Sequence, residues 1–193
     1  MDPIELRRPG QEELSGYVDA LERGWSPNTM DAEAGRRQLV EIEDDADRFL
    51  ASLVTDPGST GAPVALPDGS VARRIPGYDR WIWDGEFCGR IGFRWQPGTE
   101  ELPAHVLGHV GYAVVPWKRR RGYASEALRL LLDDVAEVGL RWIEITTDPD
   151  NVASRRVIEK VGGELVERFR YPAAYDRTVG LRYRVTTAVT PAT

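Results

Sequence analysis

The sequence predicts an α/β fold in which strands and helices alternate along much of the chain. Three observations support this prediction. Residues 107–163 follow the order strand, turn, helix, strand, capped helix. Residues 11–25 and 31–54 each carry apolar residues at helical spacing, and residues 81–95 form two apolar runs around a short turn. A length of 193 residues is enough for one domain with a sizeable core.

The N-terminal part is expected to be mostly helical. A short strand is predicted at residues 4–8, followed by helices over residues 11–25 and 31–54 that cover one face of a sheet. Residues 55–76 are rich in Gly, Pro, Asp and Ser, which predicts a long loop. Loops of this length in a compact domain are often functional or mobile.

The remaining elements follow from local patterns. Asp84-Gly85 lies between two apolar runs and predicts a hairpin with a two-residue turn. A strand is expected at residues 107–115, a helix with one buried face at 119–138, and a strand at 141–147. Asn151 is expected to cap a helix that ends at Gly162-Gly163. Two more strands are expected within residues 162–187, around a bend near Pro172, and a frayed tail at 188–193.

The composition excludes several classes of protein. The formal net charge is −6, which disfavours nucleic-acid binding and favours a cationic acceptor such as an amine. Cys88 is the only cysteine, so there is no internal disulfide, and we interpret it as a small core residue rather than a nucleophile. No apolar run is long enough for a membrane span, and the first residues do not resemble a signal peptide. We therefore expect a cytoplasmic protein without a membrane partner and without a bound metal.

The most informative segment runs from Val114 to Ser125. It reads as a strand that stops at Pro116, a basic turn, and the start of a helix. Unpaired N–H groups and the positive end of the helix dipole at such a turn favour an anion such as a pyrophosphate. Gly122 would let the backbone approach the ligand. A nucleic-acid or targeting patch, and a solvated helix start, are the alternatives for the basic run, but other charges do not extend it into a basic face. The turn carries neither Gly-Lys-Ser/Thr nor Gly-x-Gly-x-x-Gly, the signatures of nucleotide-binding loops.

The pattern Arg-x-x-Gly-x-Ala at Arg119, Gly122 and Ala124, after Val114-Val115-Pro116, resembles the acyl-CoA-binding motif of the GNAT acetyltransferase superfamily. Asn151-x-x-Ser154 and the run up to Gly163 resemble the second conserved block of that family. The resemblance covers roughly residues 78–170. Within the superfamily, the chain is similar to a branch of predicted bacterial N-acetyltransferases.

The resemblance implies a GNAT fold. This is a mixed, mostly antiparallel central sheet of six to seven strands flanked by about four helices, with two splayed parallel strands that hold acyl-CoA. A single domain over residues 1–187 is implied, with the acceptor shaped by residues 1–76 and the acyl-CoA core at residues 78–170. Acetyl-CoA is the implied co-substrate, and a homodimer is possible. The implied cofactor-binding residues are Val114, Val115, Arg119, Arg120, Arg121, Gly122, Tyr123, Ala124, Ser125, Asn151 and Ser154.

Groups for acid–base chemistry are harder to assign. Many relatives carry a tyrosine seven residues after the asparagine as the acid for the departing thiolate, but this chain has Ile158 there. His109 and Asp148 are the catalytic candidates, although a structural hydrogen bond is favoured for His109 and a turn or cap role for Asp148. Weaker candidates lie in the loop before the cofactor strand, namely Glu100, Glu101 and His105. A backbone N–H near Val114 is expected to stabilise the oxyanion.

Each candidate for an acceptor contact also has a structural interpretation. Trp83, Tyr112 and Glu126 are candidates to bind the acceptor, while packing in the core or sheet is favoured for Trp83 and Tyr112. Three functions stay open. The first is acetyl-CoA-dependent N-acetylation of a small amine, the second is acetylation of a protein N-terminus or lysine, and the third is a non-enzymatic acyl-CoA-binding module.

Overall fold

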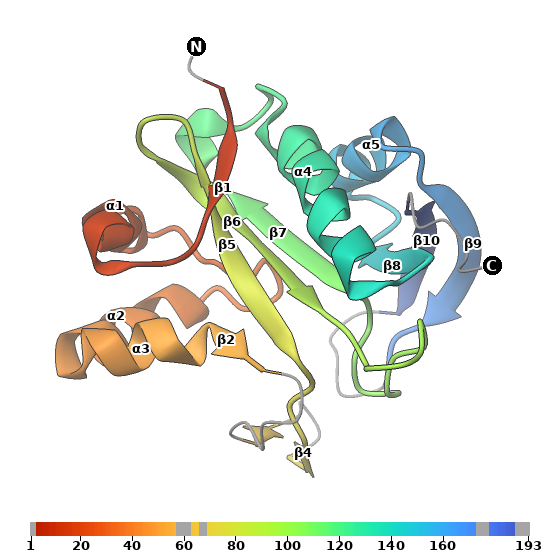
Figure 1. Cartoon of the computed structure of the whole chain (residues 1–193), viewed down its shortest axis with the longest axis horizontal. Coiled ribbons are helices and arrows are strands. Elements are labelled where there is room, and N and C mark those ends of the chain that lie inside the picture. The colour runs from red at the N-terminus through yellow and green to blue at the C-terminus, as the bar shows by residue number, and fades with distance from the viewer. Residues whose placement is uncertain (1–2, 57–62, 66–68, 173–177, 188–193) are drawn as a thin grey trace. The chain divides into compact units, whose positions relative to one another are not determined.

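The computed structural model describes residues 3–56, 63–65, 69–172 and 178–187. These residues fall into two compact units, which are presented separately. The first unit comprises the chain up to Thr55 together with Gly77–Phe93 and Gly111–Leu130. The second unit comprises the remaining described residues. The labels of Figure 1 are used throughout.

An antiparallel sheet forms the centre of the first unit. Its strands β1 (Glu5–Arg7), β5 (Gly77–Trp83), β6 (Phe87–Arg94) and β7 (Val110–Val114) lie in that order, and β2 (Val54–Thr55) also pairs with β5. In β1, Leu6 lies opposite Ile82. The predicted first strand and hairpin are therefore confirmed. The connection between β5 and β6 is Asp84–Glu86, one residue longer than the two-residue turn we predicted, and Gly85 in it has a φ of 100°.

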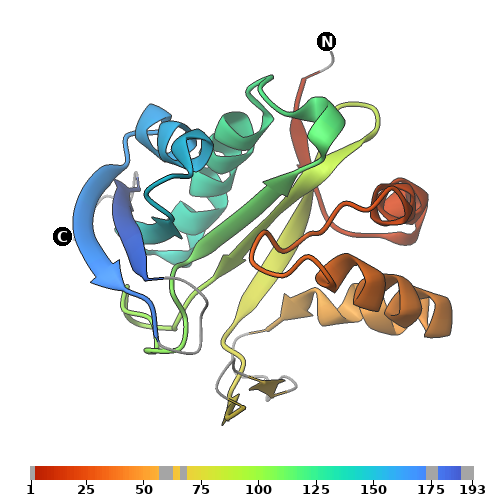
Figure 2. The same ribbon diagram turned by 180° about the vertical axis from the view of Figure 1, so that it is seen from behind.

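Three helices cover one face of this sheet, as Figures 1 and 2 show: α1 (Gln11–Glu22), α2 (Ala34–Asp44) and α3 (Ala46–Ser52). Aromatic rings dominate the core between the two layers. Tyr17 stacks on Trp81 with ring centroids 4.8 Å apart, and Phe87 meets both rings edge-on. Such pairs contribute about 1 kcal/mol each beyond their buried area. The core also contains Leu14, Ala20, Leu21, Trp25, Phe49, Ala113 and Val115.

The prediction of one helix over residues 31–54 was wrong, because the helix breaks at Asp45. This residue has extended backbone angles (φ −162°, ψ 96°), and its side chain accepts a hydrogen bond from the Arg48 N–H at 2.9 Å. Asp45 therefore ends α2 and caps α3. A carboxylate in this position satisfies a backbone donor that the first turn of a helix leaves unpaired.

Strands β6 and β7 approach each other closely at Gly89. This glycine has a φ of 151°, and a Cβ atom there would lie 2.8 Å from the Cα of Val114. Neither the conformation nor the space suits another residue. The close approach holds the end of β7, from which the basic turn begins.

The second unit contains an antiparallel sheet in the order β8 (Trp142–Thr147), β10 (Val179–Thr186), β9 (Glu164–Arg170). Helix α5 (Val152–Lys160) follows β8, as predicted, with Ile158 fully buried. Residues Val64–Ala65 (β3) and Val71–Ala72 (β4) pair with each other inside the segment that was predicted to be a loop. The predicted bend after Pro172 and the predicted tail lie outside the described residues.

Helix α4 (Tyr123–Val138) begins in the first unit and ends in the second. Its buried residues include Leu128, Leu131 and Val135, which confirms the predicted apolar face. Gly139 follows with a φ of 85°, as expected for a residue that ends a helix. Within the described ranges, every helix is too short or too polar to cross a membrane.

Candidate active site

The basic turn joins β7 to α4 in the first unit. Pro116–Lys118 form a short 3₁₀ helix, η1, and the exposed segment Arg119–Gly122 follows it. Arg120 has a φ of 61° and Gly122 a φ of 88°, whereas Arg121 between them has an ordinary negative φ. Residues in the left-handed region can turn neighbouring N–H groups toward one side of the chain, an arrangement that favours an anion. The N-terminus of α4 adds the unpaired N–H groups of its first turn, so this segment is a candidate phosphate site.

The side chains at the two ends of this turn converge on Asp84, in the β5–β6 connection. The Lys118 ammonium donates to both carboxylate oxygens at 2.9 Å, and the Tyr123 hydroxyl donates to Oδ2. Burial opposes ionisation of this carboxyl, but the hydrogen bonds from Tyr123 and Lys118 lower the pKa of Asp84 to about 2. Burial also opposes the charge on Lys118, whereas its bonds to Glu86 and Asp84 raise the pKa of the ammonium. Lys118 is therefore a charged, buried anchor and not a free cation of the turn.

Val114 and Val115, at the end of β7, were both predicted to contact acyl-CoA, but their main-chain hydrogen bonds differ. The Val115 N–H donates to the Cys88 carbonyl at 3.0 Å, and the Val115 carbonyl accepts from the Lys118 N–H at 3.0 Å. Both main-chain groups of Val115 thus have partners within the chain, and a role for Val115 in acyl-CoA binding stays a prediction. Because alternate residues of a strand point their main-chain groups to opposite sides, those of Val114 face away from β6. The Arg119 guanidinium donates to the Val114 carbonyl at 3.1 Å.

In the second unit, Asn151 caps α5. Its side-chain oxygen accepts from the Ser154 N–H at 3.0 Å, and its own N–H donates to the Asp148 carbonyl. The predicted cap is confirmed. Asn151 is exposed, and the NH2 of its side chain is not used by the cap. A role for Asn151 and Ser154 in cofactor binding stays a prediction.

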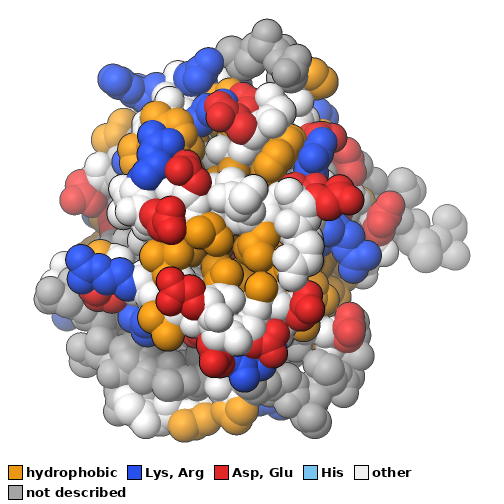
Figure 3. Space-filling model, turned by 90° about the vertical axis from the view of Figure 1, so that its left-hand side faces the viewer, with side chains coloured by type: hydrophobic (Ala, Val, Ile, Leu, Met, Phe, Trp, Pro, Cys, Tyr) orange, Lys and Arg blue, Asp and Glu red, His pale blue; other side chains and the backbone are white. Residues whose placement is uncertain are grey.

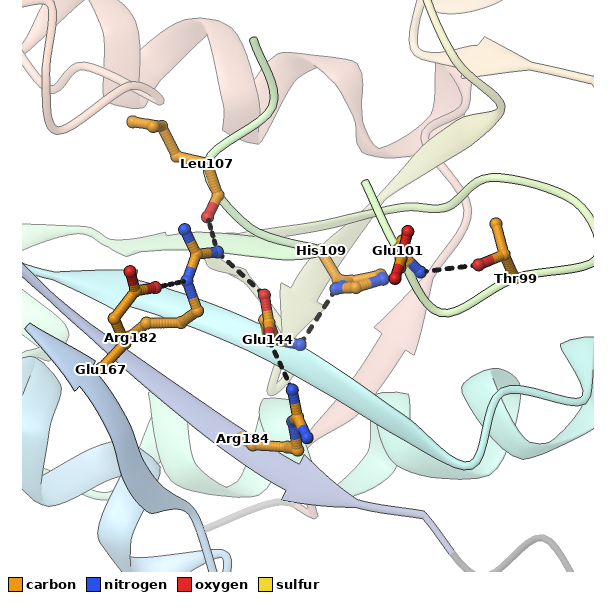
Figure 4. Close-up of polar contacts among 8 residues, drawn as sticks. All are labelled: Thr99, Glu101, Leu107, His109, Glu144, Glu167, Arg182 and Arg184. Carbon is orange, nitrogen blue, oxygen red and sulfur yellow. Dashed lines mark hydrogen bonds and ion pairs between the residues drawn. The ribbon is translucent and has the colours of Figure 1, made fainter. Parts of the chain in front are cut away.

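His109 is buried in the second unit and contacts a partly exposed polar cluster, which Figure 4 shows. Its Nδ1 accepts from the Glu144 N–H at 2.9 Å, while Glu144 also binds Arg182 at 2.8 Å. Because Nδ1 accepts, the neutral ring carries its proton on Nε2, and this atom has no hydrogen-bond partner among the described residues. Burial lowers the pKa of His109 to about 4. The lone pair that a base would use is engaged, so the structure favours the structural role over the catalytic one.

The other candidates have the following contacts. Asp148 accepts a hydrogen bond at 3.0 Å from the hydroxyl of Tyr171, a buried residue that the sequence did not single out. Glu126 pairs with Arg129 at 2.6 Å on the surface of α4. The Arg7 guanidinium lies 4.9 Å from the centroid of the Trp83 ring, which packs against the core of the first unit, and Tyr112 is half-buried on β7.

The structure gives contacts for two of the candidates in the loop before β7, Glu100 and Glu101. Glu100 pairs with Arg141 at 2.7 Å, and this hydrogen bond lowers the pKa of the Glu100 carboxyl to about 2. The Glu101 N–H donates to Thr99. The ion pair with Arg141 engages the Glu100 carboxylate, and a lowered pKa disfavours a carboxylate as a base.

Comparison with known proteins gives a consistent result. A family model described as an acetyltransferase (GNAT) domain matches residues 36–164, which is more than half of the chain. No curated protein sequence gives a significant match.

Solved structures match over nearly the whole chain. RimL, a ribosomal L7/L12 α-N-protein acetyltransferase solved with coenzyme A, is 15% identical with a TM-score of 0.61, covering 97% of this chain and 96% of its own. A GNAT-family acetyltransferase from Bacillus anthracis is 16% identical with a TM-score of 0.59, at coverages of 96% and 95%. MccE, a microcin C7 self-immunity acetyltransferase solved with acetyl-CoA and AMP, is 10% identical with a TM-score of 0.59, at coverages of 96% and 93%. At these identities the likeness establishes the fold alone.

Proposed function

Because the chain belongs to the GNAT acetyltransferase family and is an acyltransferase, we propose that it transfers an acetyl group from acetyl-CoA to a primary amine of a small molecule. The observation that carries the proposal is the turn Arg119–Gly122 at the start of α4, whose backbone is shaped to bind an anion. Acetylation of a protein N-terminus or lysine is the alternative, favoured by the likeness to RimL.

The residues present fit the cofactor that the family implies. The N–H groups from Arg120 to Ser125 would bind the pyrophosphate, with added charge from Arg119–Arg121. The main chain of Val114 and the side-chain amide of Asn151 would bind the pantetheine arm. Tyr123 would contribute through its N–H alone, since its hydroxyl is bound to Asp84. Acetyl-CoA supplies an activated acyl group as a thioester.

The proposed reaction is one direct transfer. An amine nitrogen attacks the thioester carbonyl, a C–N bond forms, the C–S bond breaks, and the thiolate leaves. A lysine-like amine has a pKa of about 10.4, so it loses one proton to solvent before it attacks. Its nitrogen loses a second proton as the amide forms, and this proton needs an acceptor in the site. We assign proton acceptance to Asp148, directly or through water, because His109 is engaged by Glu144. The Val114 N–H would stabilise the oxyanion.

An acidic N-terminal region supports a cationic acceptor. Residues 3–56 contain 13 acidic and 6 basic residues, so they carry a formal charge of −7, whereas the whole chain carries −6. On the face formed by α1, α2 and α3, Figure 3 shows acidic side chains, with basic ones among them, around a central group of hydrophobic ones. Such a field would attract an amine in its ammonium form.

Binding of acetyl-CoA measured by calorimetry tests the proposal. Gly122→Glu places bulk and negative charge in the turn, so we expect at least a tenfold loss of affinity. Gly139→Glu is the matched control, because Gly139 has nearly the same φ (85° against 88°) and equally open surroundings. Glutamate at Gly139 therefore has the same backbone strain, about 1–2 kcal/mol, without a change in the turn. Equal affinities of all three proteins, or no binding by folded wild type, would exclude the acetyl-CoA site.

The acceptor class is tested next. CoA release is measured with a panel of small amines and with peptides that carry a free N-terminus or a lysine. Turnover with small amines supports the proposal, and turnover confined to peptides supports the alternative.

A further inference from the structure

The anion-binding turn has little packing of its own. All four residues of Arg119–Gly122 are exposed, and a Cβ atom on Gly122 would have no neighbour within 4 Å. Arg120 is nevertheless in the left-handed region, which costs a residue other than glycine about 1–2 kcal/mol. A strained, exposed segment keeps one conformation only if its surroundings determine it. The Arg119 guanidinium binds the Val114 carbonyl, and further contacts that determine the conformation lie at the two ends of the turn.

Both ends are bound to one carboxylate of another segment. Lys118 is the last residue of η1, and Tyr123 is the first residue of α4. Their side chains meet at Asp84, although Lys118 is 34 residues away from it in sequence and Tyr123 is 39. The side chains of Asp84 and Lys118 are only 7% and 8% exposed, so these charge-assisted bonds are shielded from water.

We propose that Asp84 is a positioning residue for the acetyl-CoA site. By binding Lys118 and Tyr123 at once, its carboxylate fixes the distance between the two ends of the turn. The N–H groups of Arg119–Gly122 are thereby held in the arrangement that an incoming pyrophosphate requires. The turn then loses less conformational entropy when the cofactor binds. Asp84 does not itself bind the cofactor. This inference rests on the proposed function, because it concerns the turn that would hold acetyl-CoA.

Removal of the Asp84 charge need not unfold the protein. Lys118 has a second partner, Glu86, at 2.6 Å, and this carboxylate is 69% exposed. In Asp84→Asn the ammonium thus keeps a counter-charge while the turn loses its shared anchor. Tyr123→Phe is a milder second variant, since it keeps the buried ring and removes only the hydroxyl donor.

The experiment measures the Kd for CoA and the kinetic constants with the amine found in the screen. A lost charge-assisted hydrogen bond corresponds to about a tenfold change or more, so we expect the Kd and the KM for acetyl-CoA to rise about tenfold in Asp84→Asn. The kcat and the KM for the amine should stay within about twofold, since no bonding to the acceptor has changed. Tyr123→Phe should produce a smaller rise. Asp44→Asn is the control, because it removes a carboxylate from the ion pair with Arg48 in α2, away from the turn, and should change nothing.

A second readout does not depend on the cofactor. Arg119, Arg120 and Arg121 are exposed trypsin sites, so native-state tryptic cleavage reports how firmly the turn is held. Cleavage there should be faster in Asp84→Asn than in wild type or Asp44→Asn.

The outcomes separate the two proposals. A folded Asp84→Asn protein with unchanged Kd and KM would overturn the positioning role, whatever its cleavage rate. If that variant fails to fold, Tyr123→Phe decides, and an unchanged Kd for CoA overturns the role. If wild type does not bind CoA, the proposed function fails first and the role of Asp84 in affinity fails with it, while the cleavage rate still shows whether Asp84 holds the turn.

Discussion

At the scale of single residues, the burial of His109 has a consequence for acid stability. The pKa of this ring is about 4 in the folded chain, against 6.5 as the ordinary value. The unfolded chain therefore binds the proton more tightly, and the free energy of unfolding falls as the pH drops from 6.5 toward 4. At pH 4.5 the loss amounts to about 2–3 kcal/mol relative to neutral pH.

Urea unfolding of wild type and His109→Gln at pH 7 and pH 4.5 measures this contribution. The amide oxygen of glutamine still accepts from the Glu144 N–H but does not titrate. The variant should therefore lose less stability than wild type between the two pH values. Equal losses would mean that His109 is protonated in the folded state at pH 4.5.

Single residues also show where prediction from sequence fails. The turn at Arg119–Gly122 and the Asn151 cap were predictable, because a local pattern specifies each of them. Asp84 was predicted only as a turn residue, since nothing near it in sequence reveals that Lys118 and Tyr123 bind it. The engagement of His109 by Glu144 joins residues 35 apart and could not be predicted for the same reason.

At the scale of elements, the break between α2 and α3 depends on Asp45. The apolar residues Leu39, Ile42, Ala46 and Leu50 keep helical spacing across the break, which is why the sequence predicted one helix. The capping residue, Asp45, could not be identified from the sequence because Asp44 and Asp47 lie beside it. We expect Asp45→Ala to lower the free energy of unfolding by about 1 kcal/mol.

Chemical denaturation measures that change. Asp44→Ala is the control, because Asp44 forms an exposed pair with Arg48, and such pairs contribute about 0–1 kcal/mol. If both variants lose the same stability, the Asp45 cap does not stabilise α3.

At the scale of the whole molecule, the charge is uneven, and this predicts a salt effect. The −7 of residues 3–56 should attract a cationic acceptor over a distance that salt shortens to about 10 Å at 0.1 M. The KM for a dicationic amine should therefore rise more than the KM for a monocationic one between about 0.05 and 0.5 M salt. The measurement is steady-state kinetics with two amines of similar length. An equal rise for both would show that the acidic region does not guide the acceptor.

The solitary thiol of Cys88 has a practical consequence for all of these measurements. Cys88 is fully buried, and this burial, with the nearby charge of Asp84, raises its pKa to about 12. Only a thiolate reacts quickly with disulfide reagents, so Cys88 in the folded protein should not react with a colorimetric thiol reagent. Liberated CoA can then be titrated continuously in the presence of the enzyme with no background from the protein. The chain has one cysteine. A variant that unfolds would therefore be detected in the same assay, because one additional thiol per chain would react with the reagent.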